Sequence, residues 1–346
     1  MNSLTKSFLI CIILLFFGCS KTQRKTTPAF YHWQTKMELT SFENALLDSM
    51  EVTTLYVKFF DVDWDFTLKD AFPQAVVQLD GYEGDFQIIP TIFITNRTLL
   101  HIQPAQLLKL AQQLVSKIET LAVSEISEIQ IDCDWSPKTK DTYFKLLELI
   151  RQEKKEVQLS ATIRLHQVKY ADQTGVPPID KGMLMFYNMG AVDKRETKNS
   201  ILDLELAQQY LYNFDNYPVP LDVALPLFSW AVLFRDGAMI KLLTNVTTTI
   251  QQDTSRFQKV DATSINAKNS THFEVKKSTY LDGHYLYKGD QIRIEQVSHQ
   301  DLKACGEILK THLNKDPLTI SFYHLDSTIL NTFNYDFLEE VCHQFH

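Results

Sequence analysis

The sequence predicts an α/β fold in which eight parallel strands close into a (β/α)₈ TIM barrel, with a small β-rich insertion between strand 7 and helix 7. Short β-rich runs alternate with segments of helical periodicity, which is the order expected of a parallel sheet. Eight such runs can be counted, and the 346 residues of the chain exceed the roughly 250 that such a barrel needs. Most of the extra length lies in one place, before the eighth run.

The predicted strands follow one another along the chain, and they cover residues 30–34, 54–60, 88–95, 128–134, 158–166, 183–189, 219–225 and 319–324. Between them, stretches such as 104–120 and 139–154 repeat apolar residues with a helical period, and Pro104 suits the first turn of a helix. Alternating runs separated by glycine turns predict the β-rich insertion over 257–297, followed by a helix over 301–313.

Composition excludes several classes of protein. A hydrophobic fraction of 45% is too high for a disordered chain, and 34 basic against 42 acidic residues argues against a nucleic-acid partner. No C-x-x-C pair is present among the five cysteines, which excludes a zinc site made of thiolates alone. No cofactor is expected, and no metal ion is assigned to the site. Cys133 is expected to be buried, and Cys305 and Cys342 could form a disulfide.

The first residues of the chain are predicted to be a targeting signal. Lys6 precedes an apolar run over 8–17, which is the length of a signal-peptide core and too short to span a bilayer. The following Gly18-Cys19 resembles the lipobox of bacterial lipoproteins, which implies a signal peptide over 1–18, a lipid on Cys19, a tether over 19–28 and a barrel over 29–346. We thus expect a lipid-anchored protein of the bacterial cell envelope, at the outer membrane and facing the periplasm. An ordinary cleaved signal peptide is the alternative.

Polar side chains alternate with apolar ones along the predicted strands. In strand 4, Asp132 and Asp134 alternate with Ile131 and Cys133, so both carboxylates are expected to face the barrel interior. The same alternation directs further residues inward: Lys58 and Asp222, which lie deeper along their strands, and Arg164, His166, Met185, Tyr187, Ser321 and Tyr323. Asp134, His166 and Tyr187 are expected closest to the carboxyl ends of the strands, where barrel enzymes place catalysis. A structural alternative is an internal ion-pair network of Lys58, Asp132, Arg164 and Asp222, since unpaired buried charges are costly.

Strand 2 is followed by three acidic residues at alternate positions, Asp61, Asp63 and Asp65. They could supply a second carboxyl group beside Asp134, at the same rim of the barrel. They could instead hold Ca²⁺, although the glycine turn of an EF-hand loop does not follow.

The tryptophans share one predicted location. Trp33, Trp64, Trp135 and Trp230 all fall at or just beyond the carboxyl ends of predicted strands. Indole rings beside carboxylates suit a sugar, which has apolar faces and hydroxylated edges. The alternative is that these rings only close the mouth of the barrel.

The run Ile129-Gln130-Ile131-Asp132-Cys133-Asp134-Trp135-Ser136 resembles the strand-4 signature D-G-x-D-x-D-x-E of glycoside hydrolase family 18. Met185-Phe186-Tyr187-Asn188 resembles that family's Met-x-Tyr-Asp/Asn run on strand 6, and the whole chain resembles bacterial lipoproteins of the glycoside-hydrolase barrel group. The resemblance implies that Asp134 and Tyr187 position an acetamido group of the substrate, which acts as the nucleophile.

Two positions depart from that signature. Ser136 replaces the glutamate that acts as the family's general acid, and Ile129 replaces its first aspartate. Serine cannot protonate a leaving oxygen near neutral pH, so the family's mechanism cannot be transferred whole.

The resulting hypothesis is a glycoside-hydrolase-like protein that acts on an envelope or imported glycan through carboxylates at the barrel rim. Its predicted catalytic residues are Asp134, Asp132, Asp61, Asp63 and Tyr187. Its predicted substrate-binding residues are Trp33, Trp64, Asp65, Trp135, Arg164, His166, Asn188 and Trp230. The alternatives are a non-catalytic glycan-binding or scaffolding lipoprotein that has lost the family acid at Ser136, and a structural envelope protein with a packed rim.

Overall fold

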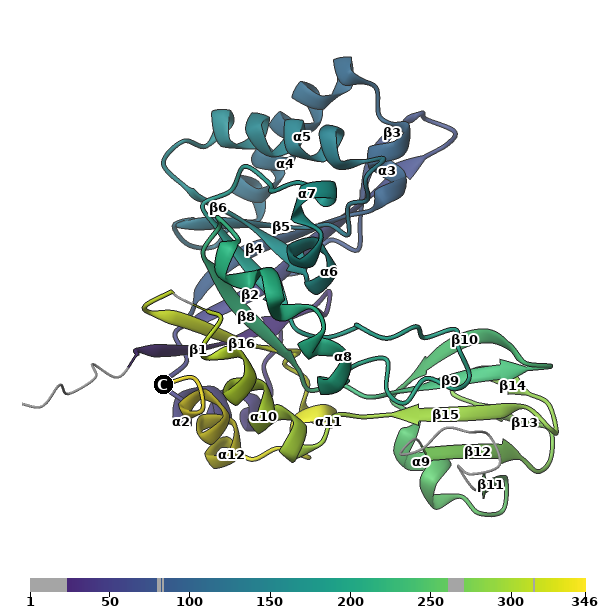
Figure 1. Cartoon of the computed structure of the whole chain (residues 1–346). Coiled ribbons are helices and arrows are strands. Elements are labelled where there is room, and N and C mark those ends of the chain that lie inside the picture. Colours follow the sequence, from purple (N-terminus) through teal and green to yellow (C-terminus); the bar gives the residue numbers. More distant parts are fainter. Residues whose placement is uncertain (1–23, 80–81, 83, 261–270, 314) are drawn as a thin grey trace, which may run out of the picture.

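A computed structural model describes residues 24–79, 82, 84–260, 271–313 and 315–346. Eight parallel strands close into a ring, which confirms the predicted (β/α)₈ barrel (Figure 1). In order around the ring, these strands are β1 (Thr26–His32), β2 (Thr54–Asp65), β4 (Gln87–Ile94), β5 (Glu128–Asp132), β6 (Gln158–Arg164), β7 (Lys181–Met185), β8 (Leu221–Pro226) and β16 (Leu318–Tyr323). β16 pairs with β1, and this pairing closes the barrel.

Helices cover the outside of the barrel. They are α2 (Ser41–Ser49), α3 (Asn96–His101), η1 (Pro104–Gln106), α4 (Leu107–Leu121), α5 (Lys140–Glu153), α6 (Leu165–Lys169), α7 (Ala171–Thr174), α8 (Leu204–Gln208), η2 (Leu211–Asn216), α10 (His299–Leu309), α11 (Ser327–Leu330) and α12 (Tyr335–His343). The amphipathic stretches predicted from periodicity are present as η1 with α4, and as α5. None of the helices in the described part of the chain has the length and hydropathy needed to cross a membrane.

The insertion between β8 and α10 is larger than the sequence predicts. It begins at Trp230 rather than at residue 257 and projects to one side of the barrel (Figure 1). Its antiparallel sheet contains β10 (Ala238–Thr244), β9 (Trp230–Arg235), β15 (Gln291–Glu295), β12 (Thr271–Val275) and β11 (Phe257–Val260), in that order. The helix α9 (Thr247–Gln252) and the hairpin of β13 (Thr279–Leu281) and β14 (His284–Leu286) complete it. Residues such as Phe257, Phe273 and Ile292 give this unit its own apolar core.

Several strand ends differ from the predicted ones. β1 already begins at Thr26, so residues 26–28 belong to the barrel and not to a tether. β2 continues to Asp65 and turns back into the antiparallel strand β3 (Asp70–Gln74). A bulge in the pairing between Lys58 and Phe60 shifts the alternation in β2, so Val62 faces the helices and Asp61 faces the other side.

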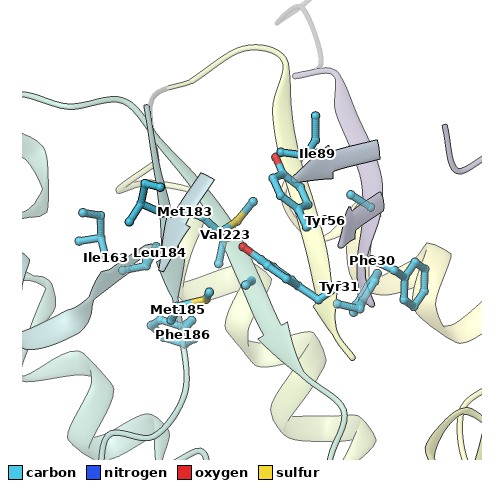
Figure 2. Close-up of a cluster of buried hydrophobic side chains, with 14 of the residues drawn as sticks. Phe30, Tyr31, Tyr56, Ile89, Ile163, Met183, Leu184, Met185, Phe186 and Val223 are labelled. Atoms are coloured by element: carbon cyan, nitrogen blue, oxygen red, sulfur yellow. The ribbon is translucent and has the colours of Figure 1, made fainter. Parts of the chain in front are cut away.

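Charges inside the barrel form separate groups rather than one network. Near the amino ends of the strands, Lys181 Nζ lies 2.7 Å from Glu128 Oε2 and 3.4 Å from Asp222 Oδ2. Asp222 also contacts Lys315 at 2.5 Å. Above this group, the rings of Tyr31 and Tyr56 reach across the interior (Figure 2) and stack at 5.0 Å. Asp222 is thus a structural residue far from the upper rim.

Three cysteines lie in the described part of the barrel. Cys133, Cys305 and Cys342 are buried free thiols, so the possible disulfide between the last two is not formed.

The Thr26 hydroxyl lies 2.9 Å from Nε2 of His346, which brings the start of β1 and the last residue together at the amino-terminal end of the barrel (Figure 1). The predicted signal peptide and Cys19 lie outside the described residues.

Candidate functional site at the barrel mouth

At one mouth of the barrel, the carboxyl ends of the strands bring several polar and aromatic side chains together. Asp132 ends β5, Asp134 follows it, and Arg164 ends β6. Tyr187 follows β7, and Tyr323 ends β16. These residues are far apart in sequence, but parallel strands converge at this edge. The predicted location of the site is therefore where the fold concentrates these side chains.

Asp134 and Arg164 form a two-point ion pair. Arg164 Nε donates to Asp134 Oδ1 at 2.5 Å, and Nη2 donates to Oδ2 at 3.3 Å. The Asp134 side chain is 52% exposed, so a ligand can reach it, whereas Arg164 is 19% exposed. Arg164 Nη1 is buried and has no hydrogen-bond partner within the described residues. The carboxylate is thus accessible, but an arginine compensates its charge.

Asp132 lies deeper and has different properties. It is 6% exposed and accepts a hydrogen bond from the Thr162 hydroxyl at 2.6 Å. Burial raises the pKa of Asp132 to about 6, Arg164 opposes this shift, and the negative charges of Asp134 and Asp61 add to it. Asp132 is therefore a carboxyl group that holds a proton in mildly acidic solution.

The three aspartates after the bulge in β2 have separate roles. Asp61 lies at the mouth, 3.3 Å from Lys58 Nζ, and is 27% exposed. Asp63 accepts hydrogen bonds from Arg97 and from the Thr95 hydroxyl, and the Arg97 bond above all lowers the pKa of Asp63 to about 2. Asp63 therefore stays ionised and cannot act as a general acid.

Asp65 stabilises the turn between β2 and β3. Its Oδ1 accepts from the backbone N–H groups of Thr67 at 2.7 Å and Leu68 at 2.9 Å. Within the part of the chain that the structure describes, no three His, Cys, Asp or Glu side chains are grouped so that they could hold a metal ion. The calcium alternative for the three aspartates is thus not supported, and neither is the predicted role of Asp65 in substrate binding.

An aromatic cluster surrounds the charged residues. Tyr323 is at its centre, with ring centroids 5.7 Å from Tyr31, 5.5 Å from Trp33, 5.5 Å from Tyr187 and 5.8 Å from Phe228. Trp230 adjoins Phe228 at 5.2 Å. We call these six residues the mouth cluster. Trp33 and Trp230 are partly exposed, so both predicted tryptophans are placed where a ligand could contact them.

The other two tryptophans do not face the mouth. Trp135 is 2% exposed, donates Nε1–H to the carbonyl of Thr174 and stacks on Tyr143 of α5. Trp64 is 9% exposed and stacks on His101 of α3. Both rings pack between strands and helices, so the prediction that they stack on a sugar does not fit their burial.

Three further predicted residues lie at the periphery. His166 is exposed on α6, because β6 ends at Arg164 and the Arg164 backbone N–H donates to the Gln167 side chain. Asn188 is exposed after β7. The Ser136 hydroxyl lies 3.2 Å from that of Thr139, in the turn that begins α5. Ser136 therefore stabilises a helix start.

Sequence reasoning missed Phe228 and the aromatic role of Tyr31. Tyr31 could have been found, because it is two residues before Trp33 and so shares its strand face. Phe228 lies in the loop after β8, where the side-chain alternation of a strand no longer predicts which way a residue points.

Comparisons with known proteins support the fold alone. No family model matches the chain, and no curated protein matches it in sequence. Among solved structures, the C-terminal domain of a putative chitinase from Desulfitobacterium hafniense DCB-2 superposes with a TM-score of 0.61 at 10% identity, over 93% of this chain and 100% of that one. The spore cortex-lytic enzyme SleL of Bacillus megaterium QM B1551 gives 0.57 at 12% identity, over 92% and 75%. A chitinase from Chromobacterium violaceum ATCC 12472 gives 0.56 at 10% identity, over 91% and 98%.

These neighbours confirm the resemblance in fold that the strand-4 and strand-6 runs predicted. The chain has the (β/α)₈ barrel fold of these solved structures, which are named as chitinases and a spore cortex-lytic enzyme.

Proposed function

We propose that the mouth of the barrel binds a glycan and that the protein is a glycoside-hydrolase-like, glycan-binding protein. The observation that carries this proposal is the mouth cluster beside the Asp134–Arg164 pair, in which the Asp134 carboxylate is exposed. Aromatic rings suit the apolar faces of a sugar, and charged groups at their edge suit its hydroxyls. The fold neighbours are named as chitinases and cortex-lytic enzymes, so chitin and cortex peptidoglycan are the first ligands to test.

The contacts of the carboxyl groups at the mouth favour glycan binding over glycan hydrolysis, because they leave no evident proton donor for the family mechanism. Ser136 replaces the acid of the resembling family, and Asp63 is held ionised by Arg97. Asp134 is engaged by Arg164 on both oxygens. Catalysis by Asp134 through the family mechanism would need a nearby acid, and Ser136 cannot supply one.

One observation favours hydrolysis as the second candidate. Asp132, whose pKa is raised by burial, lies beside the exposed Asp134, and two neighbouring carboxyl groups in different environments are the arrangement that acid–base chemistry uses. In that case Asp132 would be the proton donor, Asp134 or Asp61 the second carboxylate, and Tyr187 would orient the substrate.

Calorimetry and a hydrolysis assay test the two candidates. Chitohexaose and cortex muropeptides are titrated into wild type, Trp33→Ala and Tyr212→Ala, the last of which alters a 68% exposed tyrosine that is not a member of the mouth cluster. We expect Trp33→Ala alone to weaken binding, and no release of reducing sugar by any variant. Release by wild type that Asp132→Asn abolishes would establish hydrolysis instead. Binding that is equal in all three proteins would contradict the mouth as the site.

The cellular location is a separate proposal, which rests on the lipobox-like Gly18-Cys19. We propose that a lipid on Cys19 anchors the protein in the bacterial envelope. Expression of wild type and Cys19→Ala in a bacterial host, followed by membrane fractionation, tests it. Anchoring predicts that only the wild type remains with the membrane after a high-salt wash.

A further inference from the structure

The connection between β2 and β4 contains no helix in its described residues, which are 66–79, 82 and 84–86. In a (β/α)₈ barrel, a helix follows each strand and covers its outer face. Here the strand β3 takes that place in the sequence, and it pairs with the end of β2 instead of packing across it. The outer face of β2 therefore depends on β3 and on the neighbouring helix α4 for cover.

A cavity of about 530 Å³ lies between these three elements. Its volume is in the range of small-molecule sites. Such a cavity suits a hydrocarbon chain and offers few partners to the hydroxyls of a sugar, because its wall is mostly apolar. The apolar side chains of the wall come from all three elements and from the β2–β3 turn: Phe60, Val62, Leu68, Ala71, Phe72, Pro73, Leu110 and Leu114.

Part of this wall is exposed to water. Leu68 is 65% exposed and Phe72 is 48% exposed, whereas Phe60 and Leu114 are 0% and 3% exposed. Large apolar side chains that stay in contact with water next to an apolar cavity indicate a ligand that covers them. The cavity therefore opens at the β2–β3 turn, and a ligand that enters there would bury apolar surface.

One cation lines the cavity without an ionic partner. Nζ of Lys117 lies 5.7 Å from the centre of the Phe60 ring, and Lys117 makes no ion pair within the described residues. Lys109, by contrast, pairs with Asp70 at 2.7 Å, so its charge is already compensated. A ligand with one anionic group would therefore find its partner at Lys117.

Lys117 and the opening lie at different ends of the cavity. The ion pair of Asp70 with Lys109 holds the β2–β3 turn near the start of α4. Leu110, Leu114 and Lys117 follow at spacings of four and three residues, so they share one face of the helix. From Leu110 to Lys117 the helix rises about 10 Å. An elongated ligand can thus place an apolar chain along the two leucines and its anionic end at Lys117.

The edge of β3 disfavours a protein partner. The N–H of Ala71 already donates to the Asp70 carboxylate at 3.0 Å, and Pro73 has no N–H, so β3 offers few donors to a partner strand. A stable protein–protein interface also buries about 800 Å² on each partner, whereas this cavity has the volume of one small ligand.

We infer that this cavity is a binding site for a single-chain fatty acid. The alkyl chain lies along Leu110 and Leu114, and the carboxylate pairs with Lys117. The affinity comes mainly from the burial of methylene groups, and the ion pair selects an anionic head group. The inference does not depend on the proposed glycan site, because no residue of the mouth cluster lines this cavity.

Isothermal titration calorimetry of the full chain with dodecanoate, below its micellar concentration, tests the inference. The variants are Lys117→Gln, Lys117→Arg and the matched control Lys169→Gln, since Nζ of Lys169 also lies over an aromatic ring, 4.4 Å from the centre of Tyr210. We expect one dodecanoate per chain in the wild type. Lys117→Gln should bind it about tenfold more weakly, whereas Lys117→Arg and Lys169→Gln should bind it as the wild type does. Circular dichroism and thermal unfolding verify that each variant is folded.

A further variant and a second ligand test the two parts of the site separately. Ala71→Leu places a larger side chain in the cavity, so it should weaken dodecanoate binding by about tenfold or more and leave chitohexaose binding as in the wild type. Dodecyltrimethylammonium has the same alkyl chain with a cationic head group. It should bind the wild type about tenfold more weakly than dodecanoate does, because Lys117 repels it.

Three results would overturn the inference. The first is a wild type that takes up no dodecanoate, or a folded Lys117→Gln that binds it within about twofold of the Lys169→Gln control. The second is equal binding of dodecanoate and dodecyltrimethylammonium, which would show that no cation selects the head group. The third is a ligand-free dimer in sedimentation velocity that Leu68→Ser dissociates, which would assign the exposed apolar residues to a contact between copies.

Discussion

Arg164 engages both carboxylate oxygens of Asp134, across the neighbouring ends of β6 and β5, at 2.5 and 3.3 Å. The same arginine opposes the rise in the pKa of Asp132. One guanidinium therefore pairs with Asp134 directly and also acts on the pKa of Asp132, and both aspartates lie in the run that resembles the strand-4 signature of glycoside hydrolase family 18.

Replacement of this arginine should change the titration of its neighbour. In Arg164→Gln, the pKa of Asp132 should rise above about 6, because the opposing positive charge is lost while burial remains. Carbon-13 NMR of the aspartate carboxyl groups measures the shift. Arg97→Gln is the matched control, since Arg97 acts on Asp63 and should leave Asp132 unchanged. An Asp132 pKa that is unchanged or lower in Arg164→Gln would contradict the described electrostatics.

Asp132 should make stability depend on pH. The pKa of its folded-state carboxyl, about 6, lies above the unfolded value of 3.8, so ionisation costs folding free energy as pH rises through this window. Asp132→Asn keeps an acceptor for Thr162 but removes the cost. We measure the unfolding free energy of both proteins in urea at pH 3.5 and at pH 8. The difference between variant and wild type should shift in favour of the variant by on the order of 3 kcal/mol from the lower to the higher pH, as roughly two pKa units imply. A pH-independent difference between the two proteins would refute the assignment.

A buried ion pair should couple the insertion to the barrel. Glu295 and Arg293 are almost fully buried, and Glu295 also accepts from Ser200 and from Trp230 Nε1–H. Glu295→Leu should destabilise the protein by about 3–5 kcal/mol, because it leaves the arginine unpaired. The double variant with Arg293→Met should lose less than the sum of the single variants.

Chemical unfolding of all four proteins gives the coupling free energy of this pair. Additive losses would show that the two side chains act independently. Arg293 also donates to the carbonyls of Val192 and Lys194, so the single change Arg293→Met measures the contribution of those bonds together with the ion pair.

Trp135 should contribute to stability and not to ligand binding. Its ring is buried against Tyr143, so Trp135→Ala should cost about 3–5 kcal/mol of unfolding free energy. Trp135→Phe retains much of the packing, and its affinity for chitohexaose should equal that of wild type by calorimetry. A loss of affinity in the folded Trp135→Phe protein would place this ring at the ligand after all.

The barrel could be predicted from sequence because its strands have simple patterns. Ile129, Ile131 and Cys133 alternate with Gln130, Asp132 and Asp134, and no local structure competes with this alternation up to the end of β5. The convergence of Asp134, Arg164 and Tyr187 then follows from parallel topology alone.

The details of the site depend on features that alternation does not encode. The bulge after Lys58 turns Trp64 towards α3, and the bond from the Arg164 backbone to Gln167 ends β6 before His166. Trp135 lies beyond its strand, so its direction is decided by packing on α5 and not by the pleat. The sequence pattern does not show that the insertion begins at Trp230, because β9 is as apolar as a barrel strand.

The bond between Thr26 and His346 places the start of β1 and the last residue at the amino-terminal end of the barrel, opposite the mouth. A support coupled through His346 would therefore leave the opening unobstructed.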